Sequence, residues 1–104
     1  MNISVKNLNG SGKQFSNPQC CNSWIDHWNT NRYPDGSKTA GFCRGCKVKT
    51  NELNGGHVIK VGSYDEKRYI IPLCNKCNHD YDAVFIVDDS DLVSANCDNC
   101  VNNQ

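Results

Sequence analysis

The chain has 104 residues, enough for one domain spanning residues 1–104, and a domain of this size buries only about two-thirds of the surface that it exposes when unfolded. It has eight cysteines but only three phenylalanines and one methionine, so disulfides or metal sites are expected to supplement a thin core. The formal charge is zero, which argues against a strongly basic nucleic-acid binder, and no run approaches the roughly 20 apolar residues of a membrane span.

The expected elements are short and separated by Asn, Gly and Asp. The first fifteen residues are polar and predict an extended or loose segment, and a helix is expected over 21–31, capped by Asn22 or Ser23. Its Trp24, Ile25 and Trp28 share one face. Residues 57–61 and 68–73 predict a hairpin, followed by a short helix beginning near Cys77 and a strand at 85–87. These elements indicate a small α+β domain in which the helix and the segment 85–100 pack on a unit at 43–82.

The opening residues MNISVKNLNGSGKQF lack both the basic start and the apolar run of a secretory signal. We therefore expect the reducing cytoplasm, where cysteines favour metal binding over disulfides. Charge is also unevenly distributed. No Lys or Arg follows Cys77, while 11 basic and 5 acidic residues precede that point, leaving a basic body and an acidic C-terminal quarter.

Three Cys-x-x-Cys pairs dominate the sequence, at 43–46, 74–77 and 97–100, beside the adjacent Cys20 and Cys21. The first two pairs flank the predicted hairpin, and two residues between thiolates allow both sulfurs to bind one tetrahedral ion. Cys43, Cys46, Cys74 and Cys77 therefore predict a treble-clef zinc site. A redox dithiol and an iron site are the alternatives, since sulfur ligands alone do not distinguish iron from zinc.

The remaining cysteines suggest a second zinc site that joins the two ends of the chain. Cys97 and Cys100 would form one half, and Cys20 and Cys21 the other. Adjacent cysteines point apart in extended structure, so His27, on the predicted helix, is a candidate to replace one of them. The alternative is a buried or unligated thiol at Cys20 or Cys21 and a surface histidine at 27.

Residues 43–82 resemble the HNH endonucleases, whose zinc-bound members carry a Cys-x-x-Cys, a His-hydrophobic strand and a Leu-Cys-x-x-Cys helix start. Here these are CRGC, HVIKV and PLCNKCNH. The resemblance implies a ββα-metal fold in which His57 is the general base on a water molecule. It also implies that Asn78 or His79 is a ligand of a catalytic Mg²⁺ or Mn²⁺ on the scissile phosphate.

Two positions depart from that pattern. Gly56 stands where the family has a metal-binding Asp, and Tyr69 falls near the position of its central Asn. We therefore interpret the chain as a zinc-binding, non-catalytic relative, of phage or mobile-element type, that binds DNA, RNA or a protein partner. The alternative is a divalent-metal nuclease that uses His57.

A modest nucleic-acid face is also expected on the segment 43–77, although a solvated hairpin is the alternative reading. It would combine Tyr64 and Tyr69 with basic residues at Arg44, Lys47, Lys49, Lys60, Lys67, Arg68 and Lys76.

Overall fold

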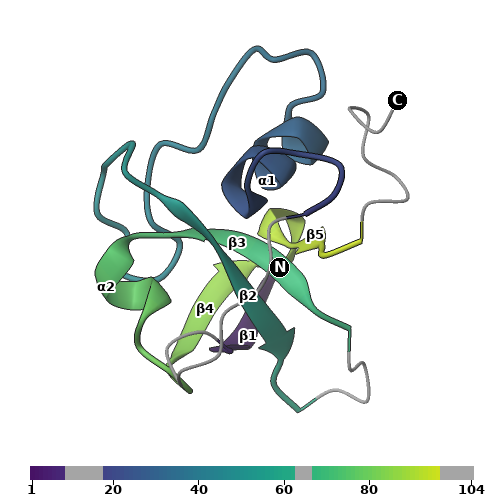
Figure 1. The fold of residues 1–104 in the computed structure, drawn as a ribbon. Coiled ribbons are helices and arrows are strands. Elements are labelled where there is room, and N and C mark those ends of the chain that lie inside the picture. Colours follow the sequence, from purple (N-terminus) through teal and green to yellow (C-terminus); the bar gives the residue numbers. More distant parts are fainter. Residues whose placement is uncertain (9–17, 63–66, 97–104) are drawn as a thin grey trace.

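Five antiparallel strands form a single sheet in the computed structural model, which describes residues 1–8, 18–62 and 67–96 (Figure 1). The elements are β1 (Asn2–Asn7), α1 (Trp24–Arg32), β2 (Asn54–Lys60), β3 (Tyr69–Leu73), α2 (Asn75–Asn78), β4 (Val84–Asp88), the 3₁₀ turn η1 (Asp89–Asp91) and β5 (Val93–Ser94). The predicted α+β class is confirmed. No helix among the described residues is long and apolar enough to cross a membrane.

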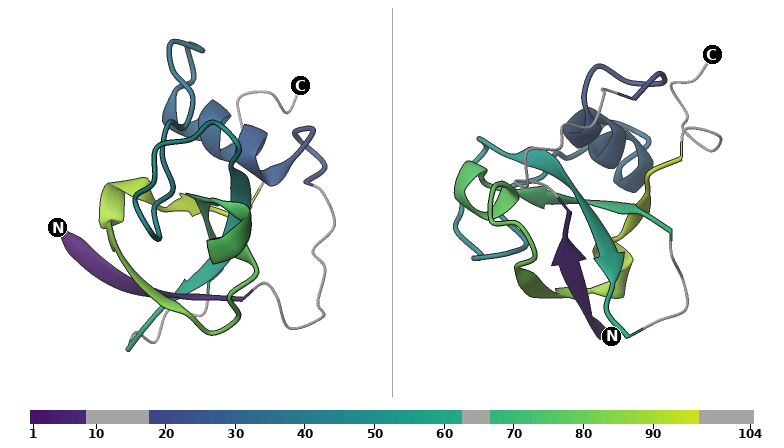
Figure 2. Two further views of the ribbon diagram at one scale, coloured as in Figure 1. Left: turned by 90° about the vertical axis from the view of Figure 1, so that its left-hand side faces the viewer. Right: turned by 60° about the horizontal axis from the view of Figure 1, so that its bottom comes forward.

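The sheet is strongly curled, because its two edge strands are close neighbours in the sequence. The strand order is β4-β1-β2-β3-β5, yet only residues 89–92 connect β4 to β5. In a flat sheet these edges would lie about 19 Å apart, at about 4.8 Å per strand. A connection that contains a 3₁₀ turn is too short for that span, so the sheet bends around its own core (Figure 2).

The core lies between the curled sheet and α1, which packs against β2, β3 and β5. Trp28 of α1 is completely buried. The sheet contributes buried apolar side chains at Val5, Val58, Ile70, Ile71, Leu73 and Val87. Ser23 begins α1, because its hydroxyl accepts a hydrogen bond from the Asp26 amide at 3.2 Å. One of the two predicted caps is therefore the actual one.

The first strand differs most from expectation. Residues 2–7 form β1, which pairs with both β2 and β4 and so lies inside the sheet. Their polar composition concealed this, although Ile3, Val5 and Asn7 alternate along one face. The predicted hairpin is present as β2 and β3, with His57 opposite Ile70.

The second helix is a single turn that begins earlier than expected. It covers Asn75–Asn78, with Cys74 at its N-cap, instead of beginning near Cys77. The first cysteine of the pair therefore precedes the helix and the second lies on it. The short strand β5 was not predicted.

Candidate metal centre

The structure brings together the four cysteines of the first two Cys-x-x-Cys pairs. The Sγ atoms of Cys43, Cys46, Cys74 and Cys77 all lie within 4.8 Å of one another, and those of Cys46 and Cys74 are 3.8 Å apart. Tetrahedral zinc with Zn–S bonds of about 2.3 Å requires sulfurs about 3.8 Å apart. The cluster can therefore hold a metal ion of the zinc type.

The first pair is shaped by a tight turn. The Lys47 amide donates to the Cys43 carbonyl at 2.9 Å, and Lys47 adopts a left-handed backbone with φ of 68°. The Gly45 amide donates to the Cys43 sulfur at 3.3 Å. A Cβ at Gly45 would lie 3.0 Å from the Cys77 sulfur and 2.9 Å from the Phe85 ring, so the turn has no room for a side chain there.

The thiols of the cluster differ in acidity. Burial alone would raise the pKa of Cys43, but backbone amides at Cys74, Cys46 and Gly45 more than offset burial and lower that pKa to about 7. Burial, together with the neighbouring thiols of Cys43 and Cys74, raises the pKa of Cys77. The cluster therefore has one thiol that readily becomes a thiolate, the form that binds metal.

Asn7, on β1, holds the segment that follows the second pair. Its side chain is fully buried, and Nδ2 lies 3.0 Å from each of the carbonyl oxygens of Cys77, Asn78 and Asp80. Its backbone also accepts a hydrogen bond from the Asp82 amide. Sequence reasoning missed this residue, and the only signal for it was its alternation with Val5.

A buried cation connects the first pair to α1 and η1. The Arg44 side chain lies over the rings of Phe42 and Trp28, and its Nε is 3.2 Å from the Asp91 carboxylate. Arg44 Nε has no hydrogen-bond partner, so its interaction with the Asp91 carboxylate is an ion pair without a hydrogen bond from this atom. Trp28 donates to the Asp91 carbonyl at 2.8 Å. Arg44 is only 5% exposed and so does not contribute to the predicted nucleic-acid face.

A second cluster consists of Cys20, Cys21 and His27, whose ligand atoms also lie within 4.8 Å of one another. The adjacent sulfurs are 3.7 Å apart, so both cysteines point to the same place, contrary to the expectation for extended chain. Cys20 is disulfide-bonded in this structure. Cys97 and Cys100, the predicted other half of this site, lie outside the described residues.

The residues expected for catalysis do not share one site. His57 is 3% exposed, and its ring packs edge-on against Trp24, with 4.8 Å between centroids. A side chain at position 56 would instead meet Leu73 and the Asn78 amide oxygen, because successive residues of a strand face opposite sides. His79 is exposed and lies back on α2, with Nδ1 2.7 Å from the Asn75 carbonyl oxygen.

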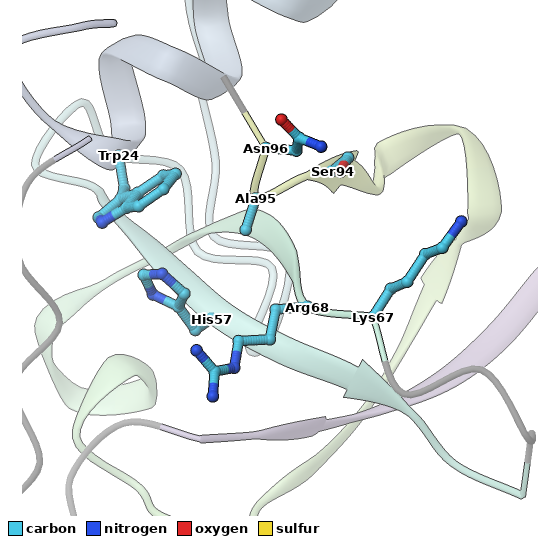
Figure 3. A pocket seen from close by; sticks show the side chains of 7 residues that line it. All are labelled: Trp24, His57, Lys67, Arg68, Ser94, Ala95 and Asn96. Carbon is cyan, nitrogen blue, oxygen red and sulfur yellow. The ribbon is translucent and has the colours of Figure 1, made fainter. Parts of the chain in front are cut away.

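His57 is one of the residues that line a pocket of about 400 Å³; the others are Trp24, Lys67, Arg68, Ser94, Ala95 and Asn96. Figure 3 shows the Arg68 guanidinium beside the His57 ring, with Trp24 on its other side, while Lys67 points away from them. Burial, followed by the charge of Arg68 and by His27, lowers the pKa of His57 to about 4. The ring is therefore neutral at pH 7.

Comparisons with protein-family models, with curated proteins and with solved structures find no match to this chain.

Proposed function

We propose that the chain is a zinc-binding module of HNH-like, treble-clef type that binds nucleic acid and does not cleave it. Zinc at Cys43, Cys46, Cys74 and Cys77 would have a structural role, because four protein thiolates leave no position open for a substrate or a water molecule. The ion would join the turn after Cys43 to the start of α2, and so hold the unit in which β2 and β3 present the pocket.

The pocket around His57 is the observation that supports nucleic acid as the ligand. Lys67 and Arg68 are exposed directly before β3, and no carboxylate is among the described residues that line the pocket. The Arg68 guanidinium beside His57 suits a phosphate, and the neighbouring Trp24 offers an aromatic surface to a base. The volume of about 400 Å³ accommodates a nucleotide.

Fluorescence anisotropy with short single-stranded and duplex oligonucleotides tests this proposal. Arg68→Gln should weaken binding about tenfold and reduce the salt dependence by about one phosphate contact. Lys38→Gln, at an exposed position outside both the pocket and the predicted nucleic-acid face, is the matched control and should bind as the wild type does. The proposal is wrong if no oligonucleotide binds, or if the two variants lose affinity equally.

A nuclease that uses His57 is the second candidate, favoured by the neutral ring beside Arg68. Hydrolysis also needs a metal ion to stabilise charge on the phosphate. At position 56, where the family has a carboxylate, the Leu73 side chain already occupies the space that a Cβ would need. Without a carboxylate at position 56 the catalytic metal ion lacks one of its ligands, so we prefer the binding function to the nuclease.

Plasmid nicking with Mg²⁺ or Mn²⁺ separates the two candidates. We expect no cleavage by the wild type. Cleavage that His57→Ala abolishes, in a chain that still folds, would establish the nuclease instead. Cleavage that persists in His57→Ala would point to a contaminating enzyme.

A further inference from the structure

The geometry of the second cluster fits a metal ion as well as the first cluster does. The Cys20 sulfur is 3.7 Å from the Cys21 sulfur and 3.3 Å from His27 Nδ1. Zinc bonds of about 2.3 Å to sulfur and 2.0 Å to nitrogen give separations of about 3.8 Å and 3.5 Å in a tetrahedral site. Two of the three separations therefore match those between ligands of one ion, and the third lies within 4.8 Å.

The His27 ring is held in an orientation that suits a metal ligand. Its side chain is completely buried, and Nε2 lies 2.8 Å from the Ser94 carbonyl oxygen. A carbonyl can only accept, so Nε2 carries a proton, and Nδ1, 3.3 Å from the Cys20 sulfur, is the nitrogen available to a metal ion. Metal-binding histidines characteristically make such a hydrogen bond with their other nitrogen.

The start of α1 explains how three residues so close in sequence converge. Ser23 caps the helix, and its carbonyl accepts the His27 amide at 3.0 Å. The chain therefore turns into the helix directly after the two cysteines, and the first helical turn brings His27 back over them. Trp24 packs edge-on against the His27 ring, with 5.2 Å between centroids, and restricts its rotation.

We propose that Cys20, Cys21 and His27 form a second site for a thiophilic divalent ion such as zinc, independent of the four-cysteine centre. The ion would bind the segment before α1 to the helix itself. Because His27 is hydrogen-bonded to Ser94, the ion would also be linked to β5. Water or a ligand from elsewhere completes the coordination. Three protein ligands of this kind leave one position open, unlike the closed four-thiolate centre.

The site requires the reduced chain, because Cys20 is disulfide-bonded in this structure and a disulfide sulfur is not a thiolate ligand. A phosphine reductant provides the reduction. The phosphorus takes an oxygen atom from water and becomes the phosphine oxide, while the disulfide accepts two electrons and two protons to give two thiols. On binding zinc, the thiols of Cys20 and of Cys21, which is a free cysteine, then release their protons.

Metal analysis of phosphine-reduced chain, after removal of loosely held ions with a weak chelator, tests the proposal. The wild type should hold two zinc ions per chain, and His27→Gln and Cys21→Ser should each hold one. His79→Gln, at an exposed histidine outside both clusters, is the matched control and should hold two. One ion in the reduced wild type, or two in the Cys21→Ser, His27→Gln double variant, would overturn the proposal.

A measurement on the unaltered chain covers the case in which these variants fail to fold. Nitrogen-15 NMR of the histidine rings should show zinc moving the His27 Nδ1 resonance while Nε2 keeps its proton. An unchanged Nδ1 resonance in fully loaded protein would exclude His27 as a ligand. Because Cys43→Ser affects only the first centre, loss of one site is distinguishable from loss of the other.

Discussion

Asn7→Ala should destabilise the domain by about 2–3 kcal/mol, although residue 7 lies far from the cysteines in sequence. The amide has two N–H groups, and a net hydrogen bond is worth about 1 kcal/mol. Truncation also removes one donor from each of these three carbonyls, which adds about 1 kcal/mol or more where no other donor replaces it. The Cys77 and Asp80 carbonyls keep backbone donors at Asp80 and Ala83, which limits the loss.

Urea unfolding of the zinc-loaded chain, followed by tryptophan fluorescence, measures this change. Lys6→Ala, at the residue next to Asn7, is the matched control. The Lys6 side chain is 41% exposed and forms only a 3.8 Å ion pair with Asp82. Its effect should stay within about 0.5 kcal/mol. If Asn7→Ala were no more destabilising than Lys6→Ala, the role assigned to Asn7 would be refuted.

Asp91→Ala leaves the Arg44 guanidinium buried without its partner and should lower the free energy of unfolding by about 3 kcal/mol, measured with urea. Acid should weaken the fold through His57. The folded pKa of about 4 lies below the ordinary 6.5, so its contribution of up to about 3 kcal/mol is present above pH 6.5 and is lost toward pH 4. Gly45→Ala should weaken zinc binding about tenfold in chelator competition, because the added Cβ lies 3.0 Å from the Cys77 sulfur.

Each of these three predictions has a control variant. Gly41→Ala has empty space around the added Cβ and should bind zinc normally. Asp82→Ala removes an exposed carboxylate and should cost less than Asp91→Ala. For the acid effect, His57→Gln should flatten the fall in stability between pH 6.5 and 4. An unchanged profile in that variant would assign the fall to other groups, such as the zinc ligands.

The sequence predicted best those features that depend on short-range geometry. Two residues between cysteines suffice for a turn around one ion, and two apolar, strand-like runs on either side of a turn-rich segment suffice for a hairpin. The Ser23 cap is equally local. These features therefore required no knowledge of the rest of the fold.

Features that depend on distant partners were not predictable in the same way. Nothing in residues 2–7 indicates that β1 pairs with both β2 and β4, and the role of Asn7 follows only from that placement. Arg44 reads as a surface cation until α1 and η1 enclose it. Cys20 and Cys21 converge only because the chain turns at Ser23 directly after them.

X-ray absorption at the zinc edge tests whether Cys43, Cys46, Cys74 and Cys77 hold one zinc ion. In the Cys21→Ser, His27→Gln double variant, only the four-cysteine centre should retain zinc. This variant should hold one zinc ion per chain, with four sulfur ligands at about 2.3 Å and no nitrogen or oxygen ligand. A folded variant that holds no zinc, or one whose zinc has fewer than four sulfur ligands, would contradict this prediction.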